Sequence, residues 1–504
     1  MPNVTPKVEM QFAGFGGAWT DVTTDVLSTI RISYGITGSG PGDRTASAGS
    51  CRFAMNNSES NAAQIPGWYS PANINRRSGF RLGIGVRVQF LDPATSTWYM
   101  KFVGTIVSIV PAPGFYGSRR SEIVATDWID EAARATVAGL TTQLNKRSDE
   151  IISLLIGNVP RAPSSQLIRT GRETFAYALD TARDDKPNPV LQEIARVTLS
   201  ELGYFYVKGN GQVTFEARSD RLNTSDAADF YQTMSDLAVA TSRDNLFTRV
   251  QVVTHPRVVD TAAVVLYRLQ SATKIDAGQT VTLLGPYTDP NDRASRVGGY
   301  DMVTPAATTD YTFNSAADGS GTDLTASLTV VASLGGNGVR WELTNSSTST
   351  GYVTKLQARG KGIYDYETTV AEAEGSASLL ATYGEQVANL DLPYMNNPAV
   401  GSDIAGAILR LYDTPFSVAS MTVSPTTAAL QTQIVARDVG DRIVFSETLV
   451  GVSDSYYIQS VDLEVIAPGI PRVTWGLAPA DLSQYWALGV ANFSELGSTT
   501  RLSF

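Results

Sequence analysis

Histidine and cysteine are the residues that a nucleophilic triad or a zinc site would need, and the chain has one of each, His255 and Cys51. His255 stands immediately before Pro256 at the end of a predicted strand, and no Gly-x-Ser-x-Gly element lies near it. These features favour a structural histidine over a catalytic base. Zinc sites need a cluster of His and Cys ligands, so two such residues in all argue against one.

The single cysteine also bears on the redox environment. One cysteine cannot form an intrachain disulfide, which fits assembly in a reducing cytoplasm. Cys51 lies in the alternating stretch 51–55 (CRFAM), where it is predicted to face a core.

Carboxylates gather at two places in the sequence. The run 289–292 (DPND) brings three oxygen-bearing side chains together, as a hard cation would require. It lacks the twelve-residue calcium loop and its closing Glu, so we expect an Asp-Pro turn. Asp184 and Asp185 are predicted to lie in a solvated loop. A glycoside hydrolase or lyase would need two carboxylates facing each other in a β groove, which the sequence alone does not place.

Gly38, Gly40 and Gly42 form a Gly-x-Gly-x-Gly pattern. A dinucleotide fingerprint has a strand before the glycines and a helix after them. Here the following residues lead into a predicted strand, so we expect no nucleotide site. The sequence therefore predicts no catalytic residue, no cofactor-binding residue, no bound cofactor and no metal ligand.

Aromatic side chains can stack on sugars. The aromatic residues that could do so in this chain are spread along β segments, which favours packing in cores or interfaces. They are Trp68, Tyr69, Trp98, Trp341, Tyr456 and Tyr457. The pairs Arg76-Arg77 and Arg119-Arg120 are isolated and are predicted to be solvated loop charges. With a formal net charge of -10 and no basic cluster, the chain lacks the usual face of a nucleic-acid reader. An acidic wall would let DNA slide past without binding.

The composition is that of a globular, β-rich protein. Of 504 residues 43% are hydrophobic and 17% charged, enough for buried cores, and the length predicts three or four domains. The start of the chain does not resemble a signal peptide, and no stretch approaches the ~20 apolar residues of a membrane helix.

Local patterns predict several elements. Helices are expected at 127–134, at 148–157 with Ser148 as the cap, from Asn188-Pro189 to a stop at Gly203, and at 401–412. A hairpin is expected between 204–207 and 212–216, because its turn contains Asn210-Gly211. Residues 417–480 are predicted to form strands.

The fold class predicted from these patterns is mainly β. It comprises two β-barrel or β-sandwich domains, a small α+β module and an inserted β-sandwich. The predicted division is 1–128 for the first β domain, 129–240 for the module, 241–269 with 360–480 for the second β domain, 270–359 for the insert and 481–504 for a C-terminal tail.

The order of several turn-plus-strand stretches resembles the tail-hub proteins of bacteriophages, a family of siphophage minor tail proteins that is similar to contractile-tail hubs. The N-terminal stretches are 43–57 (DRTASAGSCRFAMNN), 69–71 (YSP), 82–88 (LGIGVRV) and 102–106 (FVGTI). The later ones are 309–312 (TDYT) with 318–325 (DGSGTDLT), 352–361 (YVTKLQARGK), 383–385 (YGE) with 390–394 (LDLPY), 439–444 (VGDRIV), 457–461 (YIQSV) and 473–479 (VTWGLAP). The family has Pro-Gly-x-x-Val in the third stretch, and this chain lacks that proline.

The resemblance implies two tail-tube-like β domains in each chain, and a homotrimer that forms a pseudo-sixfold ring around the DNA channel of a tail baseplate. Its implied partners are the distal tail protein, the tail tube protein, the tape measure protein and tail fibre or tip proteins. Genomic DNA would pass during ejection without specific binding. The protein would reside in the virion, at the tail tip, after assembly in the host bacterial cytoplasm, and its role would be architectural, with no enzymatic activity.

An alternative stays open at this point. The chain could be a receptor-binding tail-tip protein whose segment 270–360 is a glycan-binding sandwich. Trp341 and Tyr352 would then be the first residues to test for stacking on a sugar.

Overall fold

The computed structural model describes residues 3–480 except 28, 39, 114–118, 138, 181–187, 223–224, 242–245, 414–416 and 467–468. Strands dominate the described residues, which confirms the mainly β class. Asp184, Asp185 and the tail predicted at 481–504 lie outside the described residues. Within them, no helix has both the length and the apolar character that crossing a membrane would take.

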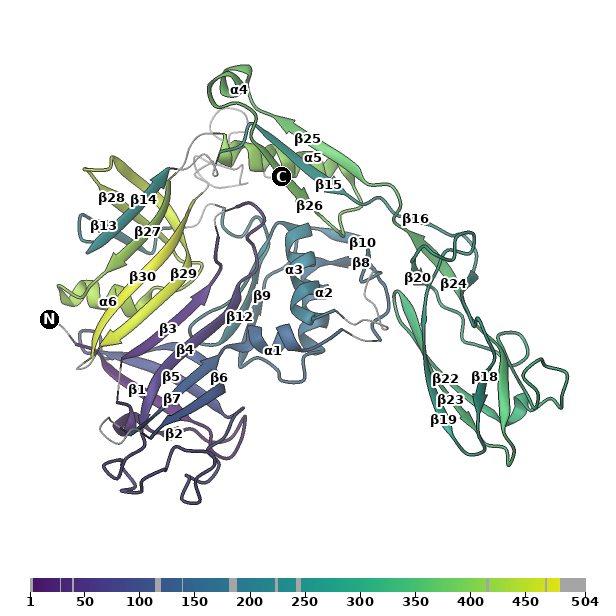
Figure 1. The fold of residues 1–504 in the computed structure, drawn as a ribbon. Coiled ribbons are helices and arrows are strands. Elements are labelled where there is room, and N and C mark those ends of the chain that lie inside the picture. The colour runs from purple at the N-terminus through teal and green to yellow at the C-terminus, as the bar shows by residue number, and fades with distance from the viewer. Residues whose placement is uncertain are drawn as a thin grey trace.

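One large sheet runs through the body of the molecule (Figure 1). In spatial order its strands are β14 (Asp236–Thr241), β27 (Ser417–Val423), β30 (Ile470–Pro479), β29 (Val452–Ile466), β3 (Ile30–Gly35), β4 (Ser47–Asn56), β7 (Arg120–Thr126), β6 (Thr97–Ala112), β5 (Gly85–Asp92), β1 (Thr5–Met10) and β2 (Thr20–Asp21). Two further strands branch from β29, namely β28 (Arg442–Glu447), which pairs with β29, and β13 (Ala228–Tyr231), which pairs with β28.

The sheet has two halves, and they join where β3 pairs antiparallel with β29. Their register runs from Gly35 opposite Ser460 to Ile30 opposite Val465. Gly35 has φ +118°, and a Cβ there would lie 2.3 Å from the carbonyl oxygen of Gln459. Glycine is therefore required at the end of this junction. The N-terminal and C-terminal β segments thus share one continuous sheet.

Alternation along the strands explains why one face of this sheet is buried. Trp475 and Phe53 are 0% and 2% exposed and point into the core, whereas Arg31, Arg52 and Arg472 lie on the solvated face. An antiparallel sheet with one wet face shows this period of two.

A smaller α+β unit packs beside the sheet. It contains α1 (Trp128–Arg134), β8 (Gln143–Arg147), α2 (Ser148–Gly157), β9 (Ser165–Ile168), β10 (Thr174–Ala178), α3 (Val190–Glu201), β11 (Tyr204–Val207) and β12 (Gln212–Glu216). The hairpin β11–β12 has the predicted bounds, and β9 pairs parallel with β12.

The helix ends differ from the predictions in detail. Ser148 is the first residue of α2 and Arg147 is its N-cap, while Pro189 is the N-cap of α3. The left-handed residue that ends α3 is Leu202, at φ +58°. Leu202 is only 4% exposed, so its burial offsets the cost of this conformation. The last helical residue is Glu201, and the left-handed C-cap is Leu202, not the predicted Gly203.

A three-stranded sheet carries the long helix near the end of the chain. Its order is β25 (Thr369–Glu374), β15 (Arg249–Thr254) and β26 (Val387–Asp391), and α5 (Pro398–Tyr412) packs on β15 and β25. α4 (Ala377–Tyr383) lies between β25 and β26 in the sequence. The prediction of strands throughout 417–480 was wrong at α6 (Ala428–Ala436), a helix capped by the Thr427 side chain.

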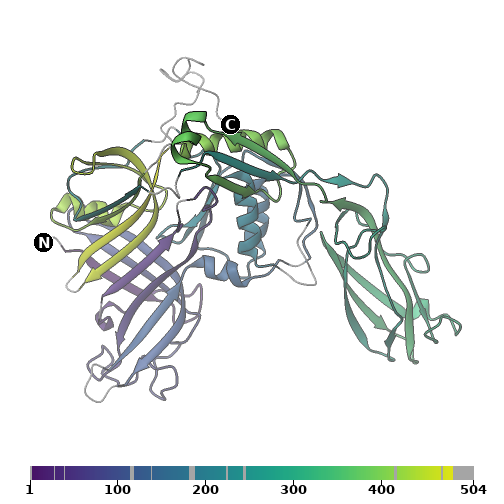
Figure 2. The same cartoon turned by 45° about the horizontal axis from the view of Figure 1, so that its top comes forward.

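The segment between β15 and β25 forms a separate β unit that projects from the body in both views (Figures 1 and 2). Its strands are β16 (Val258–Val259), β17 (Val264–Arg268), β18 (Thr273–Ile275), β19 (Thr280–Pro286), β20 (Gly298–Tyr300), β21 (Tyr311–Asn314), β22 (Leu328–Leu334), β23 (Gly338–Asn345) and β24 (Gly351–Tyr364). A core of its own, around the fully buried Trp341, holds this insert together.

The predicted domain boundaries remain a proposal. The strand pairing shows which sheet each strand near these boundaries joins. β13 and β14 fall in the segment predicted as the α+β module, yet they pair with β28 and β27 of the large sheet.

Short 3-10 turns occur at Thr23–Asp25 and Thr325–Ser327.

Candidate functional site

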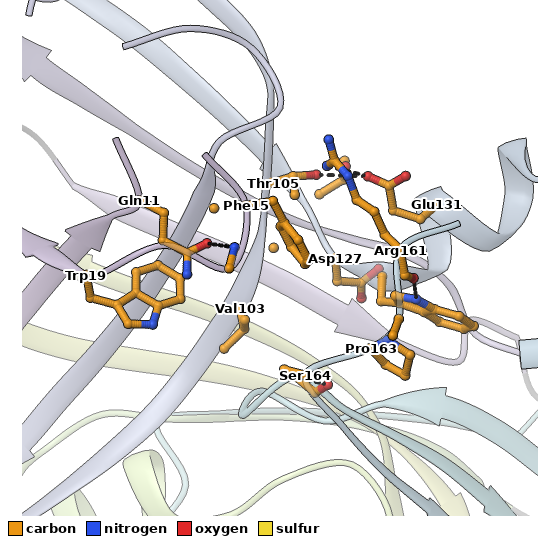
Figure 3. Close-up of a pocket in the computed structure, with 17 residues that line it drawn as sticks. Gln11, Phe15, Trp19, Val103, Thr105, Asp127, Glu131, Arg161, Pro163 and Ser164 are labelled. Atoms are coloured by element: carbon orange, nitrogen blue, oxygen red, sulfur yellow. Dashed lines mark hydrogen bonds and ion pairs between the residues drawn. The ribbon is translucent and has the colours of Figure 1, made fainter. Parts of the chain in front are cut away.

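A cavity of about 270 Å³ lies between the N-terminal half of the sheet and the α+β unit (Figure 3). The β1–β2 loop supplies Phe15 and Trp19, β6 supplies Val103, and the segment before β9 supplies Pro163 and Ser164. The cavity is therefore built from segments that are far apart in the sequence, and its walls are largely apolar.

The β1–β2 loop is held over the cavity by Gln11. Its side-chain amide donates to the carbonyl oxygen of Gly17 at 2.8 Å, and its Oε1 accepts from the N–H of Gly16 at 3.2 Å. A Cβ on Gly85 would lie 2.1 Å from Gln11 Oε1, so this glycine leaves room for the amide. The loop thus presents Phe15, which is 49% exposed, at the rim.

Charged groups form the other side of the cavity. Arg161 pairs with Glu131 at 3.0 Å, and its guanidinium lies 5.0 Å from the centre of the Phe15 ring. The indole N–H of Trp128 donates to the carbonyl oxygen of Arg161 at 2.8 Å, which fixes the backbone beside the pair. Arg161 therefore joins the aromatic rim to the α1 side of the cavity.

Asp127 also lines the cavity and caps α1. Its carboxylate accepts from the N–H of Ile129 at 3.0 Å. Burial raises the pKa of Asp127 to about 7, because the charged form loses its contact with water. The lining contains neither histidine nor cysteine, and its residues suit the binding of an apolar or aromatic side chain.

The structure places His255 in an unexpected setting. Its Nδ1 lies 3.0 Å from Asp365 Oδ2, and its Nε2 lies 2.6 Å from Asp391 Oδ1. The two aspartates flank opposite ring nitrogens and do not converge on one point. Among the described residues no group of three or more His, Cys, Asp and Glu could hold a metal ion. His255 thus bridges two aspartates, and nothing in the sequence indicated these partners.

The predicted acidic turn is present. Asp289 Oδ1 accepts from the N–H of Asn291 at 2.7 Å, and Asp292 Oδ2 accepts from the Ser295 hydroxyl at 2.6 Å. These are turn hydrogen bonds within the loop. The residues following Gly42 lead into strand β4, and Cys51 on that strand is fully buried, both as expected.

Most of the aromatic residues considered as sugar platforms are buried. Tyr69, Trp341, Tyr456 and Tyr457 are between 0% and 5% exposed. The choice of Trp341 as a glycan-stacking residue was therefore wrong, because its ring is in the core of the insert. Trp98, at 43%, is exposed.

One arginine of the predicted solvated pairs is packed. The Arg77 guanidinium lies 3.8 Å from the centre of the Phe12 ring and donates to the Tyr69 hydroxyl at 3.1 Å. Arg76 is exposed, as expected, and Arg120 pairs with Glu122 at 2.7 Å. Sequence spacing gave no indication of the Arg77 contacts, since Phe12 is on another loop.

Comparisons of sequence found no match to any protein-family model and none among curated proteins. Solved structures do resemble the chain. The 43 kDa tail protein of prophage MuSo2 from Shewanella oneidensis has a TM-score of 0.49 at 9% identity, over 94% of this chain and 99% of that one. A tail protein from Neisseria meningitidis MC58 has a TM-score of 0.48 at 9% identity, over 94% and 96%.

A third structure is the E. coli c3393 protein, a component of the type VI secretion system, with a TM-score of 0.36 at 7% identity, over 90% of this chain and 73% of that one. Its description notes structural similarity to the bacteriophage T4 tail proteins gp27 and gp5. The three structures described are thus two tail proteins, one of them from a prophage, and a component of a type VI secretion system, in agreement with the sequence resemblance to phage tail proteins.

Proposed function

We propose that this chain is a structural hub protein of a bacteriophage tail, and that three copies form a ring around the DNA channel. The observation that carries the proposal is the large sheet with its two halves joined at β3 and β29. A chain with two β halves side by side is suited to adapting a threefold assembly to a sixfold one, because three chains supply six halves.

Each half of the sheet contains a long hairpin with an irregular register. In the N-terminal half it is β5–β6, whose register shifts between Val88 and Gln89. In the C-terminal half it is β29–β30, whose register shifts between Ile458 and Ser460. Such bulges increase local twist and bend a sheet, as a curved wall requires.

The solvated face of the sheet suits a channel wall. Arg31, Arg52 and Arg472 lie there with Asp462 and Glu464, around a shallow hollow. Arg31 pairs with Glu464 at 2.9 Å, so part of the positive charge is neutralised locally. With a net charge of -10 on the whole chain, such a face offers DNA phosphates little net attraction.

The proposal extends to partners and location. The ring would join the tail tube and distal tail protein to tip or fibre proteins, with the tape measure protein in contact during assembly, in a virion built in the host cytoplasm. Cross-linking mass spectrometry of intact tails is expected to detect these neighbours. Cross-links to capsid proteins alone would contradict the placement.

Copy number and symmetry test the central claim. Electron-microscopy averages of assembled tails should show three copies of this chain around the axis, and released rings should have three times the 53.9 kDa chain mass. A single copy per tail, or a stable monomer released from assembled tails, would rule out the ring.

A further inference from the structure

The turn between β28 and β29 presents two neighbouring apolar side chains to solvent. Leu449 is 92% exposed and Val450 is 47% exposed. The turn has a defined shape, because the Leu449 N–H donates to Glu447 Oε1 at 3.0 Å and Gly451 adopts φ +68°. Isolated exposed leucines are ordinary, whereas adjacent ones on a shaped turn are typical of an interaction point.

The cavity of Figure 3 belongs to the other half of the sheet. Its rim is the β1–β2 loop, and β2 is the last strand at that end of the strand order. The Leu449 turn belongs to β28 and β29, on the opposite side of the β3–β29 junction. A knob in one half and a hole in the other cannot meet within one chain, but they can meet between neighbouring copies.

The rims of the two surfaces carry groups of opposite charge, while Asp127 and Glu131 lie in the cavity lining itself. Glu447 and the exposed Asp454 flank the turn. Arg161 lies at the cavity, and exposed Arg81 lies beside the β1–β2 loop, with its Nη2 3.6 Å from the position of a Cβ on Gly14. Because Arg161 already pairs with Glu131, Arg81 is the better placed of these two cations to face an acidic partner.

The size of the cavity also fits. Its volume of about 270 Å³ equals that of several waters, at roughly 30 Å³ each, so a leucine side chain can enter. Phe15, Trp19, Val103 and Pro163 would surround that side chain with apolar surface. Removing Leu449 from water in this way would stabilise the contact.

We propose that the Leu449–Val450 turn of one copy inserts into this cavity of the next copy. The contact is heterologous, since different surfaces of the two chains meet, and such contacts close into rings when the rotation per step allows it. This inference rests on the proposed ring and names the surfaces that would hold it together.

Assembly of the full-length chain tests the contact by mass photometry over a concentration series. Leu449→Asp should raise the concentration for half-assembly by about tenfold or more, as expected for loss of one buried leucine per contact. Ile74→Asp is the matched control, because Ile74 is 95% exposed on a different loop, and it should assemble as the unmodified chain does. Because both side chains are exposed, both variants should keep the circular dichroism of the unmodified chain.

Charge reversal gives a second readout. Asp454→Arg is chosen because Glu447 also holds the shape of the turn. Asp454→Arg and Arg81→Glu should each weaken assembly, and the double variant should restore it. Cross-linking gives a third, because Cys51 is buried and engineered thiols are then the accessible ones. A chain carrying both Leu449→Cys and Phe15→Cys should yield covalent trimers on oxidation.

The outcomes separate the two proposals. If tails contain three copies per ring but Leu449→Asp assembles normally and the two engineered thiols form no cross-link, the docking contact is wrong and the ring stands. An unmodified chain that stays monomeric throughout the series also overturns the docking contact. Tails with a single copy of the chain overturn the ring itself.

Discussion

His255 joins three segments at the point where the insert leaves the body. The histidine follows β15, Asp365 follows β24, and Asp391 ends β26. The side chains of His255, Asp365 and Asp391 are 14%, 27% and 64% exposed. A protonated imidazole donates to both carboxylates, whereas a neutral one can donate to only one of them. The charge state of the His255 imidazole should therefore control how firmly the insert is held to the body.

The charged groups around the His255 imidazole decide whether its pKa is raised or lowered. The hydrogen bond to Asp365 raises the pKa of His255 above the usual 6.5, burial opposes it, and Asp391 adds to the increase. Burial would raise the pKa of Asp365, but His255 and the nearby Arg257 outweigh it and lower that pKa. Arg257 itself pairs with Asp180 at 3.0 Å, and the charge of Arg196 acts on Asp365 as well.

Substituting His255→Gln should reduce the stability of this junction by about 1–2 kcal/mol near pH 6. A charge-assisted hydrogen bond contributes about 1.5–3 kcal/mol, and the Asp391 contact is discounted because that side chain is largely exposed. The histidine contribution is complete below its unfolded pKa and disappears as pH rises through its higher folded pKa. The Asp365 contribution is complete above its unfolded pKa and disappears as pH falls through its lower folded pKa.

His255 is the one histidine of the chain, so its titration can be followed directly by NMR of ring-labelled protein. We expect a pKa above 6.5, a large decrease in Asp365→Asn and a smaller one in Asp391→Asn. Hydrogen exchange of β16 and β24 in His255→Gln should be faster at pH 6 and unchanged at alkaline pH. A pKa at or below 6.5 in the unmodified protein would refute this account.

Three further predictions follow from single side chains. Burial raises the pKa of Asp127 to about 7. The contribution of the protonated carboxyl to folding stability is therefore complete below its unfolded pKa and is lost as pH rises through about 7. Denaturant titrations at several pH values should show the free energy of unfolding falling by up to about 1.4 kcal/mol per pH unit between these two pKa values, and Asp127→Asn should remove this slope. Cys51 is buried and burial raises the pKa of its thiol, so a thiol reagent should label it only after denaturation, and rapid labelling of the native chain would contradict its position. Thr308 is exposed at φ +62°, so Thr308→Gly should stabilise the insert by about 1 kcal/mol in thermal unfolding, whereas Thr308→Ala should show no such gain.

Local patterns predicted local structure well. The hairpin at 204–216 was predicted from its Asn-Gly turn, and the helix after Pro189 from its apolar spacing. Both signals depend on residues within one turn or one helix, where the sequence itself carries the information. α6 was missed because the stretch 428–436 (AALQTQIVA) shows no clear amphipathic period, and its formation depends on packing against β5, β6 and β30.

The candidate site could not be predicted in the same way. The cavity residues come from five separate stretches between 11 and 164, and Gly211 adds a sixth. The partners of His255 are 110 and 136 residues away. Neither set leaves a spacing pattern, because the contacts depend on how strands pair over long separations.

The pairing at the end of the large sheet bears on how copies can meet. An open strand edge would allow a neighbour to add its own strand. At the β1 end this route is blocked, since the Val8 N–H donates to Thr23 Oγ1 at 2.9 Å and the Val8 carbonyl accepts from Val22 at 2.9 Å. β2 itself has only two residues. With these two backbone groups of Val8 occupied, the middle of the β1 edge cannot accept a new strand. The apolar cavity beside it offers a contact through side chains instead.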